Sequence, residues 1–140
     1  ELRLVGSEMC IRDRDMKLFA DLIRRANSKN LIFSAVDALL MSSYQLGAPG
    51  AIAAILTAAP GPSVKLWNAV QNENWDVALD LHQKLMPLWD AIGLDNMPSL
   101  CKYAQKLQGL NAGYARKPTS PATKTQKEKV EIALKGLGLI

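Results

Sequence analysis

The side chains that could do chemistry are few and widely separated in this 140-residue sequence. There are two cysteines, Cys10 and Cys101, and one histidine, His82. They form no zinc or iron ligand set, so we expect no bound metal and no cofactor. Asp37 is more informative, because it directly follows the apolar run at residues 31–36. A carboxylate at that position can accept hydrogen bonds from the first turn of a following helix.

The hydrophobic periodicity from residue 15 to residue 62 predicts alternating helices and strands. Apolar residues recur at helical spacing over residues 15–26, and two short apolar runs, 31–36 and 51–56, are predicted as strands buried on both faces. Between them we expect a helix at 38–46, capped by Asp37 and ended by Gly47. Two parallel strands need neighbours on both edges, so we expect this chain to be part of a larger α/β domain.

From residue 63 onward the pattern predicts helices alone. Three helices are expected around residues 64–70, 75–92 and 98–107, and prolines make 114–121 an extended connector. Thr125 and Glu128 have the spacing of a capping box at the start of a last helix. Because they fall on helical periods, the three tryptophans, Trp67, Trp75 and Trp89, are expected in the core.

The first fourteen residues show neither a helical nor a strand period. The run at residues 5–14 is similar to the translation of a sequencing adapter, so we expect residues 1–14 to be a non-native segment. The alternative is a genuine flexible extension at the N-terminus.

The charge of the chain is unevenly distributed. The net charge is +4, and residues 102–140 are the basic part, with eight basic and two acidic residues. Beyond Tyr114 these basic residues are not interleaved with aromatic residues, and they form no arginine cluster, so we do not expect nucleic-acid binding. The longest apolar stretch, at 50–62, is too short to cross a bilayer, so we expect no membrane association and a cytoplasmic location.

From about Asp15 to Ile140 the sequence resembles the C-terminal part of the dihydrodipicolinate synthase and N-acetylneuraminate lyase family. The resemblance lies in Phe-Ser-Ala-Val-Asp at 33–37, Leu-Gly-Ala-Pro-Gly-Ala-Ile at 46–52, the segment at 82–88, Pro98 with Lys102, and the C-terminal Leu-Gly-Leu-Ile. It implies an α/β fold, the (β/α)8 TIM barrel with a C-terminal helical domain. Residues 15–62 would supply the last βα units (helix, strand, helix, strand), and residues 63–140 the helical region.

The family resemblance also implies class I aldolase chemistry. A lysine on the sixth barrel strand forms a Schiff base with a 2-oxo acid such as pyruvate. The position of that lysine corresponds to Cys10, inside the adapter-like run. We therefore expect this chain to contain no catalytic residue, although the longer protein of which it would be a part (the parent) would be a lyase or aldolase.

One side of the active-site mouth is expected to remain, because barrel enzymes build their sites at the C-terminal ends of strands. The resemblance places Ala35, Asp37 and Ile52 at positions that contact the 2-oxo acid or the aldehyde. For Asp37, helix capping without substrate contact is an open alternative.

The resemblance further implies a homotetrameric parent, with Met16 and Leu46 near a contact between subunits. A core position for Leu46 is the alternative. The competing interpretation of the whole chain is a helical oligomerisation or interaction module without catalytic activity. Such a module would not need two buried strands, which favours the lyase.

The genomic sequence upstream of Asp15 tests this interpretation directly. We expect a lysine codon five positions before Asp15, where this chain has Cys10. Sequencing the locus with adapter-trimmed reads that extend upstream of Asp15 makes the measurement. Any other codon at that position would reject the Schiff-base class.

Overall fold

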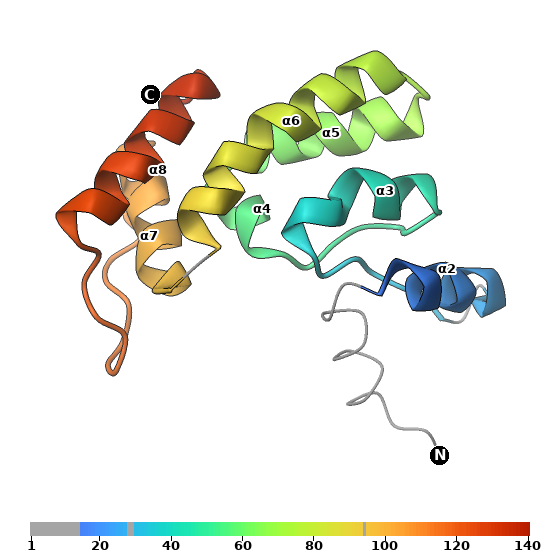
Figure 1. The fold of residues 1–140 in the computed structure, drawn as a ribbon, viewed down its shortest axis with the longest axis horizontal. Coiled ribbons are helices and arrows are strands. Elements are labelled where there is room, and N and C mark those ends of the chain that lie inside the picture. The colour runs from blue at the N-terminus through green and yellow to red at the C-terminus, as the bar shows by residue number, and fades with distance from the viewer. Residues whose placement is uncertain (1–14, 28–29, 94) are drawn as a thin grey trace.

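The computed structural model describes residues 15–27, 30–93 and 95–140, and in this part of the chain the regular structure is helical (Figure 1). Helix α6 crosses the middle of the molecule, with α5 and α3 on one side and α7 and α8 on the other. The elements in chain order are α2 (Met16–Arg25), the short 3₁₀ helix η1 (Asp37–Leu39), α3 (Leu40–Gln45), α4 (Ala54–Ala58), α5 (Pro60–Gln71), α6 (Trp75–Ile92), α7 (Met97–Leu107) and α8 (Lys124–Gly136).

The two predicted strands are present only as one parallel bridge, between Ser34 and Ala51. The N–H of Ser34 donates to the carbonyl of Gly50 at 3.0 Å, and the N–H of Ile52 donates to the carbonyl of Ser34 at 2.8 Å. The parallel direction is as predicted. The prediction of full strands at 31–36 and 51–56 is wrong, because within the described residues no third strand lies beside the pair and residues 54–58 form α4.

The predicted burial of these two segments on both faces is also wrong. Ser34 and Val36 are buried, but Leu31 is 63% exposed and Ile52 is 77% exposed. Side chains alternate between the two faces of an extended segment. In the described structure only one face of the pair is covered by helices.

The hydrophobic core lies around α6. This helix packs against neighbours on more than one side, so its apolar residues cover more of its circumference than a single stripe. Each fully buried large aliphatic side chain contributes about 1.5–3 kcal/mol relative to an exposed one. The largest side chains with no more than 2% exposure are Phe19, Leu40, Ile55, Leu66, Leu85, Leu88, Ile92, Leu100, Val130 and Leu134.

The last helix begins two residues earlier than predicted. Its capping box is formed by Thr123 and Gln126, whose side chains each accept a hydrogen bond from the other residue's backbone N–H, and not by Thr125 and Glu128. Both pairs have the required spacing. The earlier start is favoured because it adds helical hydrogen bonds while Val130 stays buried.

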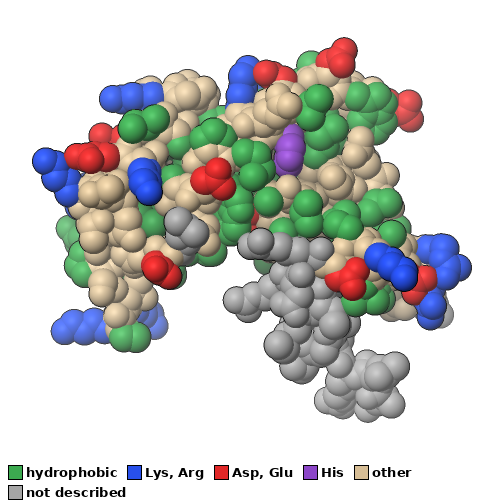
Figure 2. Space-filling model, in the orientation of Figure 1, with side chains coloured by type: hydrophobic (Ala, Val, Ile, Leu, Met, Phe, Trp, Pro, Cys, Tyr) green, Lys and Arg blue, Asp and Glu red, His purple; other side chains and the backbone are tan. Residues whose placement is uncertain are grey.

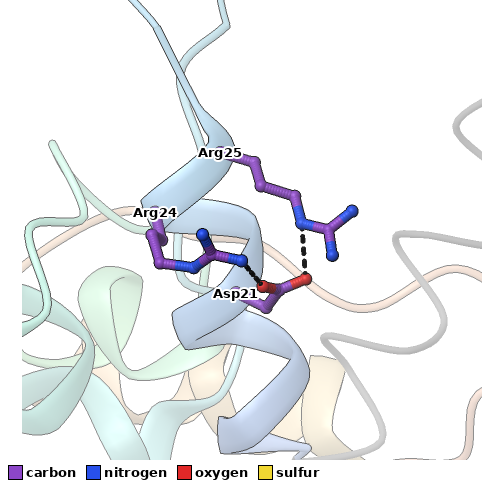
Figure 3. A network of polar contacts seen from close by, with 3 residues as sticks. All are labelled: Asp21, Arg24 and Arg25. Carbon is purple, nitrogen blue, oxygen red and sulfur yellow. Dashed lines mark hydrogen bonds and ion pairs between the residues drawn. The ribbon is translucent and has the colours of Figure 1, made fainter.

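Helix α2 is amphipathic, as its periodicity predicts. Asp15 caps it by accepting the N–H of Leu18 at 2.8 Å. On its exposed face Asp21 pairs with Arg24 at 2.6 Å and with Arg25 at 2.7 Å (Figure 3). The hydrogen bond from Arg24 lowers the pKa of the Asp21 carboxyl. These pairs are largely in solvent, so they are screened by salt and keep this face of α2 hydrated.

Trp75 is not in the core, contrary to the prediction. It is 44% exposed, because it is the first residue of α6 and follows a turn in which residues 71–74 are also exposed. Trp67 and Trp89 are half-buried and pack against the core. Hydrophobic side chains are visible on the surface over α5 and α6 (Figure 2).

The two residues predicted at a subunit contact differ in exposure. Met16 is half-buried, and Leu46 is 39% exposed at the end of α3. Their role in a contact between subunits stays a prediction. Among the described helices, none combines the length and the apolar character needed to cross a membrane.

The exposed apolar residues beside the parallel bridge predict that the isolated chain self-associates. We expect Ile52→Lys, which charges a side chain that is 77% exposed, to shift the chain towards monomers. Sedimentation velocity measures the effect. The matched control is Ile132→Lys on α8, where the side chain is 71% exposed and far from the bridge in sequence. A wild-type chain that is a monodisperse, cooperatively melting monomer would contradict the prediction.

Candidate functional site

The three predicted substrate positions, Ala35, Asp37 and Ile52, line one open cavity with a volume of about 530 Å³. They lie just beyond the bridge residues Ser34 and Ala51, where the two extended segments end. The structure thus brings together residues that the sequence placed on separate strands. The remaining lining consists of Val36, Ala53, Ala54, Trp89, Gly93 and Met97.

Asp37 is the polar centre of the cavity wall. The prediction that its side chain caps the following helix is wrong, because neither η1 nor α3 has a side-chain cap. One carboxylate oxygen instead accepts the backbone N–H of Ile55 at 2.6 Å, in the first turn of α4. The carboxylate of Asp37 therefore lies at the N-terminal, positive end of α4. Its partner Ile55 is 18 residues further along the chain.

Burial controls the protonation of Asp37, whose residue is only 7% exposed. Removal from water raises the pKa of this carboxyl, while hydrogen bonds from the backbone N–H groups of Ile55, Asp37 itself and Ala54 act in the opposite direction. The desolvation effect is the larger of the two, so the pKa is above the ordinary value.

A second buried polar contact fixes the elements beneath the cavity. The hydroxyl of Ser34, in the bridge, donates to the hydroxyl of Ser43 in α3 at 2.9 Å. Both serines are almost fully buried. A buried hydroxyl without a partner would cost about 1–3 kcal/mol, so this pair favours one position of α3 against the extended segments.

The sequence did not predict that the helical region reaches the cavity. Trp89 and Gly93, near the end of α6, and Met97, at the start of α7, all line it. A Cβ atom at position 93 would lie 2.7 Å from atoms of the Trp89 ring, so glycine leaves the space that the indole occupies. The spacing of four residues between Trp89 and Gly93 could have indicated that the indole packs over the glycine. No local signal in the sequence shows that the end of α6 lies beside the cavity.

The nucleophilic side chains near the cavity are unsuited to attack a substrate. The thiol of Cys101 lies 4.0 Å from the carbonyl of Ala54, and burial raises its pKa, which keeps it protonated. Lys102, predicted to be solvated, is half-buried, donates to the carbonyl of Ala112 at 2.5 Å and lines a different pocket. Among the described residues no lysine lines the cavity.

Two further residues considered in the sequence lie elsewhere. His82 is half-buried on α6, where burial lowers its pKa, and it does not line the cavity. Cys10, at the predicted position of the Schiff-base lysine, lies outside the described residues. The described wall can therefore bind a ligand through one carboxylate, backbone groups and apolar contacts.

Residues 3–137 match the model of the dihydrodipicolinate synthetase family. The chain belongs to this family. Among its curated relatives is the 4-hydroxy-tetrahydrodipicolinate synthase of Archaeoglobus fulgidus, which is 30% identical over 126 residues, covering 90% of this chain and 44% of the relative. The enzyme of the same name from Thermodesulfovibrio yellowstonii is 32% identical, over 90% of this chain and 43% of the relative.

Solved structures give the same assignment. A dihydrodipicolinate synthase matches 90% of this chain and 43% of its own with a TM-score of 0.77 at 28% identity. The N-acetylneuraminate lyase of Fusobacterium nucleatum, complexed with pyruvate, matches 86% of this chain and 41% of its own with a TM-score of 0.75 at 27% identity. The chain thus has part of the family's TIM-barrel fold, and it spans less than half the length of the relatives it matches.

Replacement of Asp37 tests its electrostatic role. Because burial raises its pKa, the folded chain holds this proton more tightly than the unfolded chain, so stability from this group is lost as the pH rises above the ordinary value of 3.8. Asp37→Asn keeps an acceptor for Ile55 without the charge and should be at least as stable as wild type at pH 7. Asp37→Ala leaves the N–H of Ile55 unpaired and should lose about 1–2 kcal/mol.

Urea unfolding at pH 4 and pH 7 measures these differences, at protein concentrations low enough to limit association. The advantage of Asp37→Asn over wild type should shrink at the lower pH. An Asn variant that loses as much stability as the Ala variant would contradict the account of Asp37.

Proposed function

We propose that this chain is the C-terminal part of a lyase or aldolase that forms a Schiff base with pyruvate or another 2-oxo acid. Membership of the dihydrodipicolinate synthetase family supports this, as does the likeness to a lyase solved with pyruvate. The observation that carries the proposal is the cavity, because Ala35, Asp37 and Ile52 all line it. In the proposed enzyme this chain supplies one wall of the substrate site.

The proposed reaction begins with a lysine that precedes Asp15 in the parent. Its amine attacks the ketone carbon of the 2-oxo acid, and loss of water gives an imine. The protonated imine accepts an electron pair from the adjacent carbon, which has lost either a proton or a carbon substituent. The resulting enamine can add to an aldehyde, and the reverse sequence releases one. In either direction, Asp37 can accept a hydrogen bond from a hydroxyl group of the aldehyde-derived part.

The parent is proposed to be a cytoplasmic homotetramer with Met16 and Leu46 near a subunit contact. The partly exposed Leu46 is consistent with this role. An inactive helical module remains the second candidate, and the predominance of helices in the described residues favours it. The parallel bridge and the cavity at its end favour the lyase, because an interaction module needs neither.

Borohydride reduction in the presence of pyruvate tests the proposed function. The imine takes up hydride and becomes a stable secondary amine, so the full-length protein should gain the mass of one reduced pyruvate on a lysine before Asp15. This chain alone should stay unlabelled, because its described lysines do not line the cavity. Peptide mass spectrometry locates the label. Stoichiometric labelling of Lys17, or of any later lysine, would overturn the assignment of the reactive amine.

A further inference from the structure

The lysine pocket is a second cavity, formed by α7, the connector that follows it and the first turn of α8. Lys102, Lys106, Tyr114, Thr119 and Lys127 are among the residues that line it. All of its described lining lies within residues 99–127, and none of it is shared with the cavity around Asp37. Its volume of about 220 Å³ is below the range of about 300–1,000 Å³ that is typical of drug-sized ligands, so it suits a small ligand.

Positive charge is concentrated at this pocket. Lys102 and Lys106 are four residues apart on α7, so they lie on one face of that helix and repel each other. Lys127 adds a third positive charge from α8, which packs against α7. Helix α7 contains no acidic residue, and no acidic residue is among the described residues that line the pocket. A bound anion would relieve this repulsion.

Other helices of this chain pair their basic residues with acidic ones three or four residues away. Such pairs occur on α2, α6 and α8, as Asp21–Arg24, Asp21–Arg25, Asp80–Lys84 and Lys124–Glu128. In the described part of the chain, the three lysines of the pocket take part in no ion pair. Glu131 lies four residues after Lys127, but it accepts a hydrogen bond from the hydroxyl of Tyr103 and does not line the pocket.

Two of the three ammonium groups are held in place by contacts that leave donors for a ligand. Lys102 donates to the carbonyl of Ala112 at 2.5 Å, and the next residue of the connector, Gly113, lines the pocket. The Nζ atom of Lys127 lies 5.4 Å from the centre of the Tyr103 ring, in a cation–π contact. An ammonium group can donate several hydrogen bonds, so neither contact exhausts its donors. Both lysines are half-buried, which limits their competition with water.

We propose that the lysine pocket binds a small phosphate-bearing anion through Lys102, Lys106 and Lys127. A phosphate group carries a charge of about −1.5 to −2 near neutral pH, so it can offset most of the charge of these lysines. Lysine binds phosphate as a point charge, and such charge-assisted hydrogen bonds are about twice as strong as neutral ones. The anion would connect α7, the connector and α8. This inference does not depend on the proposed function.

The test is calorimetric titration of the full-length protein with inorganic phosphate, at neutral pH and at an ionic strength held constant with chloride. We expect one phosphate per chain, with a Kd of about 1 mM or lower. Pyruvate should not displace it, because the two cavities share no lining residue. Phosphoserine distinguishes the sources of the phosphate group. Tighter binding than inorganic phosphate indicates a phosphorylated metabolite, and weaker binding indicates the free ion.

Substitutions of single lysines make the test specific. Lys106→Gln removes an exposed ammonium group and should raise the Kd for phosphate by about tenfold, because a charge-assisted hydrogen bond is lost. Lys106→Arg keeps the charge and should bind phosphate within about threefold of wild type. The matched control is Lys135→Gln on α8, which removes an exposed charge outside the pocket and should change the Kd by less than about twofold.

Four results would overturn the proposal. The first is a full-length protein that does not bind phosphate, and the second is a Lys106→Gln variant that binds it as tightly as wild type. The third is an equal loss in Lys135→Gln, since the attraction would then come from the overall charge. The fourth is displacement by pyruvate, which would place the anion in the other cavity. Tighter binding of malonate than of phosphate would reject phosphate as the ligand class. Borohydride labelling tests the proposed function separately.

Discussion

The hydrogen bond from the N–H of Ile55 to the carboxylate of Asp37 is the contact on which the rest of the site depends. It joins the end of the extended segment that contains Ser34 to the start of α4. Helix α4 directly follows the extended segment that contains Ala51. The bridge between Ser34 and Ala51 aligns the same two segments a few residues earlier. Together these contacts place Ala35 and Ile52 beside one cavity. The charge of Asp37 is buried at a cost in free energy, which the backbone N–H groups only partly offset.

The two halves of the chain make different contributions to this cavity. Residues 35–37 and 52–54 supply the carboxylate and the ends of the extended segments. The helical region supplies the apolar surface of Trp89 and Met97. Helix α6 connects the two contributions, because it packs against α5 and α8 in the core and ends at the cavity. The packing of this helix therefore fixes where the indole lies.

Local patterns were sufficient to predict most helices. The period of α2 and the proline in the first turn of α7 are properties of neighbouring residues, so the sequence shows them directly. Ala35, Asp37 and Ile52 were predicted from a family resemblance and line one cavity. The chemistry of that cavity stays a proposal.

The errors have non-local causes. The extent of a strand depends on neighbouring strands, which the residues of 31–36 do not encode. Asp37 had two backbone segments available as hydrogen-bond donors, and only the fold decides that it binds Ile55. In the same way, Thr123 and Thr125 offered equivalent capping boxes, and packing of α8 selected the first. Trp89 and Asp37 line the same cavity only because of the path of the chain between them, so no spacing in the sequence reveals it.

The most direct test of the central claim is a crystal structure of the full-length protein after reduction with pyruvate and borohydride. We expect the reduced adduct on a lysine before Asp15, with its free end directed towards the cavity lined by Ala35, Asp37 and Ile52. An adduct attached to a lysine of this chain, or one at a site separate from that cavity, would contradict the account.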